Sequence, residues 1–257
     1  MTAAKKQKLI ADWKHEEDIA RIVGWDFSHI EGRYFEDTAL PRDYRDEILK
    51  RLKPDMKLLD IDTGGGEFLL SLGHTHELTA ATENYPPNVS LCRDRLIPLG
   101  IDFRQADGNG ILPYDDGAFD MVIDRHGDFN AKEIYRVLKP GGMFITQQVG
   151  AYNDRRFVEL LLGDAEIPFP DQKFDIACRK FEAAGFNIVD GCECFRPIRF
   201  FDVGALVWFA RIIEWEFIGF SVDRCLDRLM DVHRMIVRDG FVEAMTHRFF
   251  LAAQKQR

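Results

Sequence analysis

Residues 56–66 read Met-Lys-Leu-Leu-Asp-Ile-Asp-Thr-Gly-Gly-Gly, an apolar strand that runs directly into a glycine-rich turn. Glu83 follows at the end of the next apolar segment. Glycines let backbone N–H groups approach a ligand closely, and an acid at the end of the second strand of a βαβ unit can accept hydrogen bonds from ribose hydroxyl groups. The two features together predict a site for a nucleoside-containing cofactor.

The spacing of the glycines argues against the usual dinucleotide-binding fingerprint. A Rossmann oxidoreductase requires G-x-G-x-x-G, with the third glycine in the first turn of the following helix. Counted from Gly64, that third position holds Leu69. An NAD-dependent dehydrogenase is therefore the least favoured enzyme class. A tight turn that binds no ligand is the structural alternative, because glycines serve any such turn.

The same stretch resembles the first motif of the class I S-adenosylmethionine-dependent methyltransferases, in which closely spaced glycines follow an acid. Asp60 corresponds to the acid, and Gly64 and Gly66 correspond to the second and third glycines. Asp62 departs from the pattern, because it stands where the family usually has its first glycine. Whether the turn is as tight as in other members depends on that residue.

The resemblance covers about residues 55 to 150. Leu112–Asp120 is similar to the family's LPF-D-FD stretch before the fourth strand, and Ile134–Gly142 is similar to its RVLKPGG stretch before the fifth. Each stretch is a structural signature, and their joint presence carries the resemblance. It implies a Rossmann-like fold and S-adenosyl-L-methionine as the cofactor.

The resemblance also implies which residues contact that cofactor. Glu83 follows Asp60 at about the spacing of 20 residues expected for a ribose-binding acid, with a solvated loop glutamate as the alternative. Asp107 ends the third strand, where family members commonly bind the adenine amino group, and Gly108 would let the ring approach the backbone; a simple turn aspartate is the alternative. The expected cofactor-binding residues are Asp60, Asp62, Thr63, Gly64, Gly66, Glu83, Asn84, Asp107, Gly108 and Asp124.

Catalytic residues are expected at the carboxyl ends of the parallel strands, where such sheets bind ligands. Asp124 and His126 follow the fourth of these strands. Asp124 or the backbone that follows it would meet the methionine part of the cofactor. His126, with a reference pKa of about 6.5, is the candidate base or else a structural histidine. Gln147, Trp25 and Trp215 are candidate substrate-binding residues, with an ordinary core role as the alternative.

Alternating strands and short helices between residues 57 and 149 predict a parallel sheet covered on both faces. The predicted class is α/β: a doubly wound, mostly parallel seven-stranded sheet with an antiparallel last strand, N-terminal helices and a helical insertion before the last strand. The expected domains are an N-terminal helical cap (1–54), a Rossmann-like core (55–195 and 247–257) and a substrate-lid insertion (196–246).

The composition and charge of the chain indicate which kinds of substrate and ligand to expect. Of the 257 residues, 46% are hydrophobic and 30% are charged, as in globular proteins. The net charge is −9 and no Lys/Arg-rich run appears, which favours small-molecule substrates over nucleic acid. The five cysteines are scattered without zinc-site spacing, so reduced thiols and no metal are expected.

No apolar run approaches the roughly 20 residues that span a bilayer, and the N-terminus lacks the apolar region of a signal peptide. The sequence therefore predicts a cytoplasmic methyltransferase, without membrane partners, that transfers a methyl group to a small molecule by in-line displacement. An RNA methyltransferase and a non-catalytic S-adenosylmethionine-binding module remain as alternatives. A homodimer is compatible with the sequence.

Overall fold

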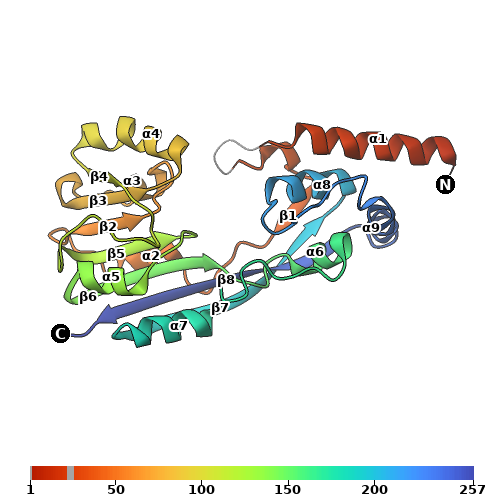
Figure 1. Ribbon diagram of the computed structural model, residues 1–257. Coiled ribbons are helices and arrows are strands. Elements are labelled where there is room, and N and C mark those ends of the chain that lie inside the picture. The colour runs from red at the N-terminus through yellow and green to blue at the C-terminus, as the bar shows by residue number, and fades with distance from the viewer. Residues whose placement is uncertain (1, 22–25) are drawn as a thin grey trace. The chain divides into compact units, whose positions relative to one another are not determined.

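The computed structural model describes residues 2–21 and 26–257 (Figure 1). The chain divides into two compact units. The first comprises Met1–Ala39, Ala151–Pro170 and Phe195–His247, and the second comprises Leu40–Gly150, Asp171–Cys194 and Arg248–Arg257. Two long strands, β7 (Phe186–Phe200) and β8 (Val242–Lys255), contribute residues to both units.

The second unit contains the predicted doubly wound sheet, with strand order β7-β8-β6-β5-β2-β3-β4. Its remaining strands are β2 (Leu58–Ile61), β3 (Thr79–Glu83), β4 (Asp102–Gln105), β5 (Phe119–Arg125) and β6 (Leu138–Val149). Strands β2 to β6 pair in parallel, whereas β8 pairs antiparallel with β6. The α/β class and the antiparallel last strand are therefore confirmed.

Helices cover both faces of this sheet, which is why every residue of β2 and β3 is buried. One face packs against α2 (Tyr44–Leu49), α3 (Glu67–Ser71) and α4 (Pro86–Arg95). The other packs against α5 (Ala131–Val137) and α7 (Phe174–Ala183). Short 3-10 turns, η2 (His76–Leu78) and η3 (Ile97–Leu99), precede β3 and β4.

Arg136 explains why the two family-like stretches occur together. Its guanidinium donates to the carbonyl oxygens of Leu112 (2.9 Å) and Tyr114 (2.7 Å) in the first stretch. It also forms an ion pair with Glu133 one helical turn earlier, at 2.7 Å. This arginine holds the loop before β5 against α5, so the motifs stabilise one local structure.

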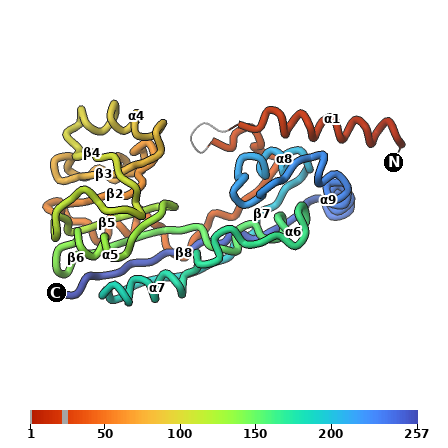
Figure 2. Tube along the Cα trace, viewed as in Figure 1, coloured from red at the N-terminus to blue at the C-terminus, as the bar shows by residue number. Residues whose placement is uncertain are grey.

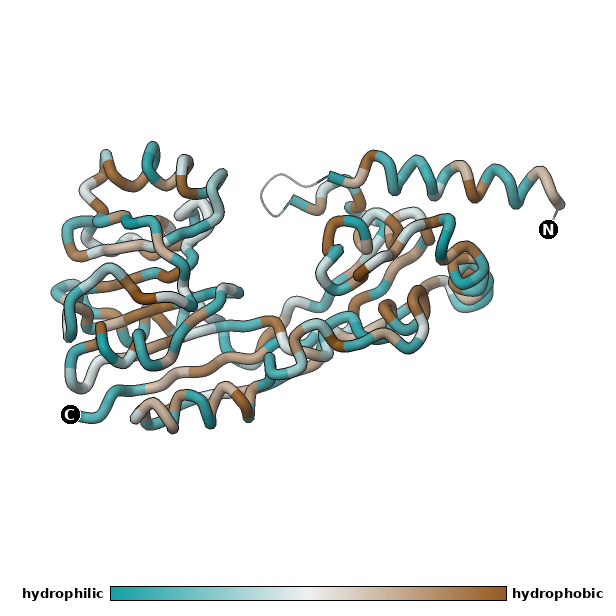
Figure 3. The backbone as a smooth tube through the Cα atoms, viewed as in Figure 1, coloured by the Kyte–Doolittle hydropathy of each residue, from teal (hydrophilic) through white to brown (hydrophobic). Residues whose placement is uncertain are grey.

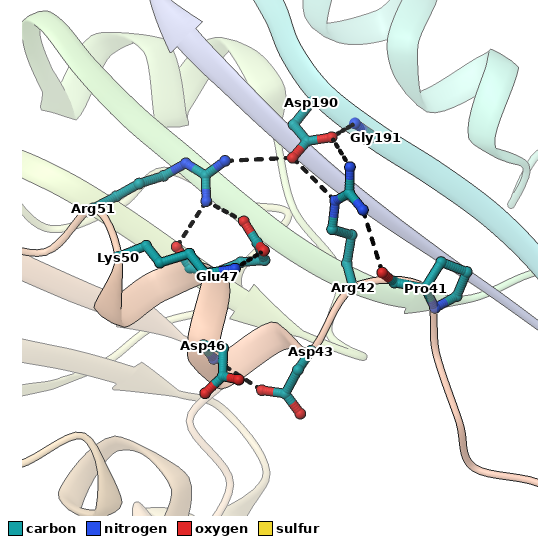
Figure 4. Close-up of polar contacts among 9 residues, drawn as sticks. All are labelled: Pro41, Arg42, Asp43, Asp46, Glu47, Lys50, Arg51, Asp190 and Gly191. Carbon is teal, nitrogen blue, oxygen red and sulfur yellow. Dashed lines mark hydrogen bonds and ion pairs between the residues drawn. The ribbon is translucent and has the colours of Figure 1, made fainter.

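A network of ion pairs attaches α2 to β7 within the second unit (Figure 4). Asp190 on β7 accepts from Arg42 (3.3 Å) and from Arg51 (3.4 Å). Glu47 of α2 accepts from both Lys50 and Arg51, which lie just after the end of that helix. The network places α2 beside the sheet, and Tyr44 of that helix reaches the carboxyl end of β5.

The first unit is mainly helical, as the path of the chain in Figure 2 shows. It contains α1 (Ala3–Ile19), η1 (Ser28–Ile30), β1 (Tyr34–Glu36), α6 (Arg155–Leu162), α8 (Val203–Ile212) and α9 (Leu226–Asp239). Its separate core is rich in large apolar side chains, among them Phe157, Phe200 and Trp208. Helix α1 is mostly hydrophilic along its length (Figure 3) and buries Trp13.

Two features of the architecture differ from the expectation. The sheet has eight described strands rather than seven, because β1 pairs antiparallel with the last residues of β7. Helix α6 lies in a stretch for which no element was expected, and it buries Phe157, Val158 and Leu161 on one face. The two compact units divide the chain after residue 39 and place residues 151–170 in the first unit.

No helix among the described residues combines the length and the apolar character that a membrane crossing requires.

Candidate active site

The glycine-rich turn after β2 adopts left-handed backbone conformations at three positions. Asp62 has φ of 50°, Gly64 of 63° and Gly66 of 80°. Aspartate is one of the few residues with a side chain that tolerates this region of φ/ψ space. Asp62 therefore supports the turn at the place where a glycine was expected, and the turn forms with Gly66 opening α3.

Asp60 lies at the base of the turn and is almost completely buried, with 3% of its surface exposed. The hydroxyl of Thr63 donates to its carboxylate at 2.6 Å. Burial raises the pKa of Asp60 to about 7, and the neighbouring charges of Asp62 and Glu83 act in the same direction. Asp60 therefore holds the turn at the end of β2 through its hydrogen bond from Thr63.

Glu83 connects the turn to the start of α4. One carboxylate oxygen accepts from the backbone N–H of Gly64 (2.9 Å) and from the Asn88 amide (3.3 Å). The other accepts from the backbone N–H groups of Asn84 and Tyr85, both at 2.8 Å. Four donors occupy the lone-pair directions of one carboxylate, so Glu83 organises the edge at which β2 and β3 end.

Asp107 and Gly108 follow β4 at the same edge. Asp107 accepts from the backbone N–H of Asn109 at 2.9 Å, which forms a local turn. A Cβ on Gly108 would lie 2.2 Å from the carbonyl oxygen of Asp128, so that position has no room for a side chain. The loop after β4 therefore lies against the loop after β5, close to Asp62, whose carboxylate accepts from Asp128 N–H at 3.2 Å.

Asp124 is the last residue but one of β5, and the two oxygens of its buried carboxylate differ in their hydrogen bonds. Its Oδ1 accepts from Gln148 Nε2 and from the Thr146 hydroxyl, the latter at 3.3 Å. Its Oδ2 is buried and has no hydrogen-bond partner. Burial raises the pKa of Asp124 well above its usual value, and the charges of Asp62 and Asp60 add to the effect. The Tyr44 hydroxyl donates to the Asp124 carbonyl oxygen at 2.9 Å.

His126 follows β5 in a left-handed conformation, with φ of 64°. Its Nε2 lies 3.3 Å from Nε2 of Gln147, and its backbone N–H donates to the Gln147 carbonyl at 3.0 Å. Its imidazole pKa is lowered, because surrounding atoms desolvate the ring and the guanidinium groups of Arg248 and Arg125 repel a positive charge. The lowered pKa favours the neutral ring, and because the residue itself is exposed, solvent reduces the effect of desolvation.

The fold gathers most of the predicted residues at the carboxyl ends of β2, β3, β4, β5 and β6, all in the second unit. These are Asp60, Asp62, Thr63, Gly64, Gly66, Glu83, Asn84, Asp107, Gly108, Asp124, His126 and Gln147. Trp215 belongs to the first unit. Trp25 lies outside the described residues.

Sequence reasoning missed Gln148, Asn88 and Tyr44. Gln147 and Gln148 occupy opposite faces of β6, so the first reaches His126 and the second reaches Asp124. Only Gln147 had been singled out, although two successive glutamines at the end of a buried strand were a readable signal. Asn88 and Tyr44 carried no such signal, because their roles depend on contacts with distant segments.

Within residues 2–21 and 26–257, no group of three or more His, Cys, Asp or Glu side chains is arranged to hold a metal ion. The cysteines at positions 92, 178, 192, 194 and 225 are not joined by disulfide bonds.

The carboxylates at this edge of the sheet fit S-adenosylmethionine as a ligand. The carboxylates of Asp124 and Asp62 would attract a positively charged group, whereas the space beside Gly108 is filled by the carbonyl oxygen of Asp128. S-adenosylmethionine carries positive charge on its sulfonium and its ammonium group. The residues present are therefore compatible with that ligand.

A comparison with known protein families matches the segment of the chain that carries most of these residues. Residues 59–146 match the family described as "Methyltransferase domain". A candidate methyltransferase from Bacillus halodurans C-125 shares the fold with a TM-score of 0.57 and 17% identity, over 83% of this chain and 99% of that one. The YcgJ protein of Bacillus subtilis does so with a TM-score of 0.56 and 15% identity, over 83% and 98% of the two chains.

The [4+2]-cyclase SpnF also shares the fold, with a TM-score of 0.50 and 19% identity over 82% of this chain and 80% of that one. The structural similarity at these low identities shows a common fold and nothing further. SpnF is a cyclase, so proteins with this fold carry out more than one kind of reaction. No curated protein matches the sequence significantly.

Proposed function

We propose that this chain, whose residues 59–146 match the family described as a methyltransferase domain, transfers a methyl group from S-adenosylmethionine to a small molecule in the cytoplasm. One observation carries the proposal. The glycine turn, Glu83 and Gly108 meet at the carboxyl ends of three adjacent parallel strands. This is the edge at which open α/β sheets bind their ligands.

The order of the strands suggests how a nucleoside cofactor would lie. Asp107 and Gly108 after β4 would receive the adenine, and Glu83 at the end of β3 would receive the ribose. Glu83 already binds four donors, so ribose hydroxyl groups would replace one or more of them. Asn84, Thr63 and the turn residues Gly64 and Gly66 would support this placement through the backbone.

When bound, S-adenosylmethionine would supply a sulfonium methyl group whose carbon the acceptor atom attacks in line, with S-adenosylhomocysteine as the leaving group. The protein then has to position the acceptor and remove a proton where the acceptor requires it. His126 is neutral at neutral pH and could take that proton, and Gln147 would orient its ring. Its lowered pKa makes it a weak base, which suits an acceptor that becomes acidic as it reacts.

The substrate side of the proposal depends on the first unit and on the charge of the chain. We propose Trp215, in the segment 196–246, as an apolar contact of the acceptor; this residue has 43% of its surface exposed. The net charge of −9 favours a small acceptor over RNA.

The proposal is tested by titrating the purified protein calorimetrically with S-adenosylmethionine, S-adenosylhomocysteine and NAD. We expect micromolar binding of the first two and no heat from NAD. A labelled-methyl assay then compares a metabolite extract with total RNA as acceptor. Label in RNA alone would replace the small-molecule assignment, and binding without transfer to either pool would favour a non-catalytic module. Light scattering of the same sample tests the expected homodimer.

A further inference from the structure

Two arginines lie at the carboxyl ends of β5 and β6, on the side of the sheet edge away from the acidic residues of β3 and β4. Arg125 is the last residue of β5, and it pairs with Gln147 of β6. Val149, two residues after Gln147, pairs with Arg248 of β8. Paired residues, and residues two apart on one strand, point to the same face of a sheet. Both guanidinium groups therefore extend from the face to which Gln147 points.

Arg125 is an exposed arginine whose position is fixed by aromatic side chains. Its guanidinium lies over the Phe68 ring, 5.4 Å from the centroid, and Phe68 is stacked on Tyr44 with 5.1 Å between the ring centroids. Among residues 2–21 and 26–257, no carboxylate lies within ion-pair distance of this guanidinium. The chain has 43 acidic and 34 basic residues, so carboxylates are in excess and Arg125 is still left without one.

The candidate base His126 is the neighbour of this positively charged group. Its Nε2 lies 3.3 Å from Nε2 of Gln147, on the same face as the two arginines. Desolvation and then the positive charges of Arg248 and Arg125 lower the pKa of the imidazole, so both guanidinium groups lie near the ring. An anion bound at this point would offset the two charges beside His126.

The chemistry of the group selects an anionic ligand. A guanidinium presents its N–H donors in a planar fork that matches the oxygens of a carboxylate or a phosphate, and it stays charged at every physiological pH. A cationic ligand would be repelled here. His126 as a base serves only an acceptor atom that carries a proton. The anionic group and the acceptor atom are therefore different parts of one molecule.

We propose that the methyl acceptor is an organic acid whose carboxylate or phosphate group binds Arg125 and Arg248, while a separate O–H or N–H group of the same molecule lies at His126. This inference rests on the proposed function and names the class of its substrate. The anionic group keeps all of its bonds. The acceptor oxygen or nitrogen forms a bond to the methyl carbon, the carbon–sulfur bond breaks with its electron pair passing to sulfur, and the proton passes to His126.

The first experiment separates a metabolite extract at pH 7 on anion- and cation-exchange resins and assays each fraction with labelled S-adenosylmethionine. We expect labelled product from the fraction that the anion exchanger retains. Phosphatase treatment of this fraction then distinguishes the two sources, because activity is lost for a phosphate and kept for a carboxylate. Product from the other fractions alone would overturn the inference and leave the proposed function standing. Product from no fraction would mean that the proposed function itself fails.

The labelled product also reports which atom received the methyl group. An ether or an N-methyl product is stable in mild base, and this is the expected result. Release of labelled methanol would identify a methyl ester. The carboxylate would then be the acceptor itself, which would overturn its role as a separate binding group.

Arg125→Gln removes the unpaired charge. The initial rate at a low concentration of the anionic fraction should fall about 10- to 100-fold, as expected when a charge-assisted hydrogen bond is lost. Arg125→Lys keeps the charge and should lose less than about threefold. The matched control is Arg179→Gln on α7, which removes the same charge from an exposed ion pair with Asp175 and should leave the rate unchanged. A loss of S-adenosylhomocysteine affinity equal to the loss of rate would assign Arg125 to the cofactor and overturn the inference.

A measurement that needs no turnover uses inorganic phosphate as the probe, with and without S-adenosylhomocysteine. The ring resonances of His126, assigned by their absence in His126→Asn, should shift when phosphate is added at pH 7. Sodium chloride at the same ionic strength should not produce this shift, and Arg125→Gln should abolish it. A shift of the same size in wild type and Arg125→Gln, or no shift in either, would place the anion elsewhere and overturn the inference.

Discussion

Replacing Glu83 with alanine removes the carboxylate that joins the glycine turn to α4. The residue has 5% of its surface exposed, and it accepts hydrogen bonds from three backbone N–H groups at 2.8–2.9 Å and from Asn88 at 3.3 Å. We expect the variant to lose both stability and cofactor affinity, because the same four contacts define the edge where the ribose is proposed to bind.

The magnitude follows from the environment of each donor. A hydrogen bond to a charged group contributes about 1.5–3 kcal/mol. Tyr85 is 63% exposed and Asn84 is also exposed, so water can replace the carboxylate for these two N–H groups. The Gly64 bond lies deeper and should account for most of the loss. We therefore expect destabilisation by about 2–4 kcal/mol and a drop in S-adenosylmethionine affinity of about 10- to 100-fold.

Urea unfolding at pH 7 measures the first quantity, and calorimetric titration measures the second. Asn88→Ala serves as the matched control, because it removes the longest of the four contacts and should cost less than about 1 kcal/mol. A Glu83→Ala protein that binds the cofactor as tightly as the wild type would refute the placement of the ribose. An unchanged unfolding midpoint would refute the structural role of the carboxylate.

Four further outcomes are expected. Gly108→Ala should abolish cofactor binding and lower the melting temperature, since its Cβ would lie 2.2 Å from a backbone oxygen, whereas Gly110→Ala, with its nearest contact at 3.3 Å, should do neither. His126→Ala should lower turnover at least tenfold with little change in cofactor affinity; equal loss of both, or of neither, would exclude it as the base. The free energy of unfolding of the ligand-free protein should fall as the pH rises from about 5 to 8. The Asp60 pKa of about 7 in the folded state lies above its value in the unfolded state, so the folded state binds more protons in that window. A free energy of unfolding that rises with pH, measured by urea titration, would contradict this. Asp190→Asn should cost about 1 kcal/mol or less, a difference that 1 M salt should remove in the same assay.

The sequence was sufficient for the elements whose signals are local. The strand before Gly64 is mostly apolar because the sheet is covered on both faces, and Asn130 caps α5 by accepting from the N–H groups of Lys132 and Glu133. Strands separated by short helices admit few topologies, so the parallel sheet followed from their order.

Elements that depend on distant partners were not predictable in this way. Strand β1 has three residues and is defined by its pairing with β7, far along the chain. Helix α6 has eight residues, and a helix this short is stable only when an apolar face such as that of Phe157 and Leu161 packs into a core.

The same division holds at the candidate site. The residue types and their order along the chain determined which acids and glycines gather at the carboxyl edge of the sheet, since successive parallel strands end there. Only the tertiary structure decided that Asp62 adopts a left-handed φ, that Glu83 binds four donors and that Asp62 and Asp124 meet beside Gly127. These properties depend on distances and burial between segments, and the pKa of a carboxylate is set by its neighbours in space and not by its neighbours in sequence.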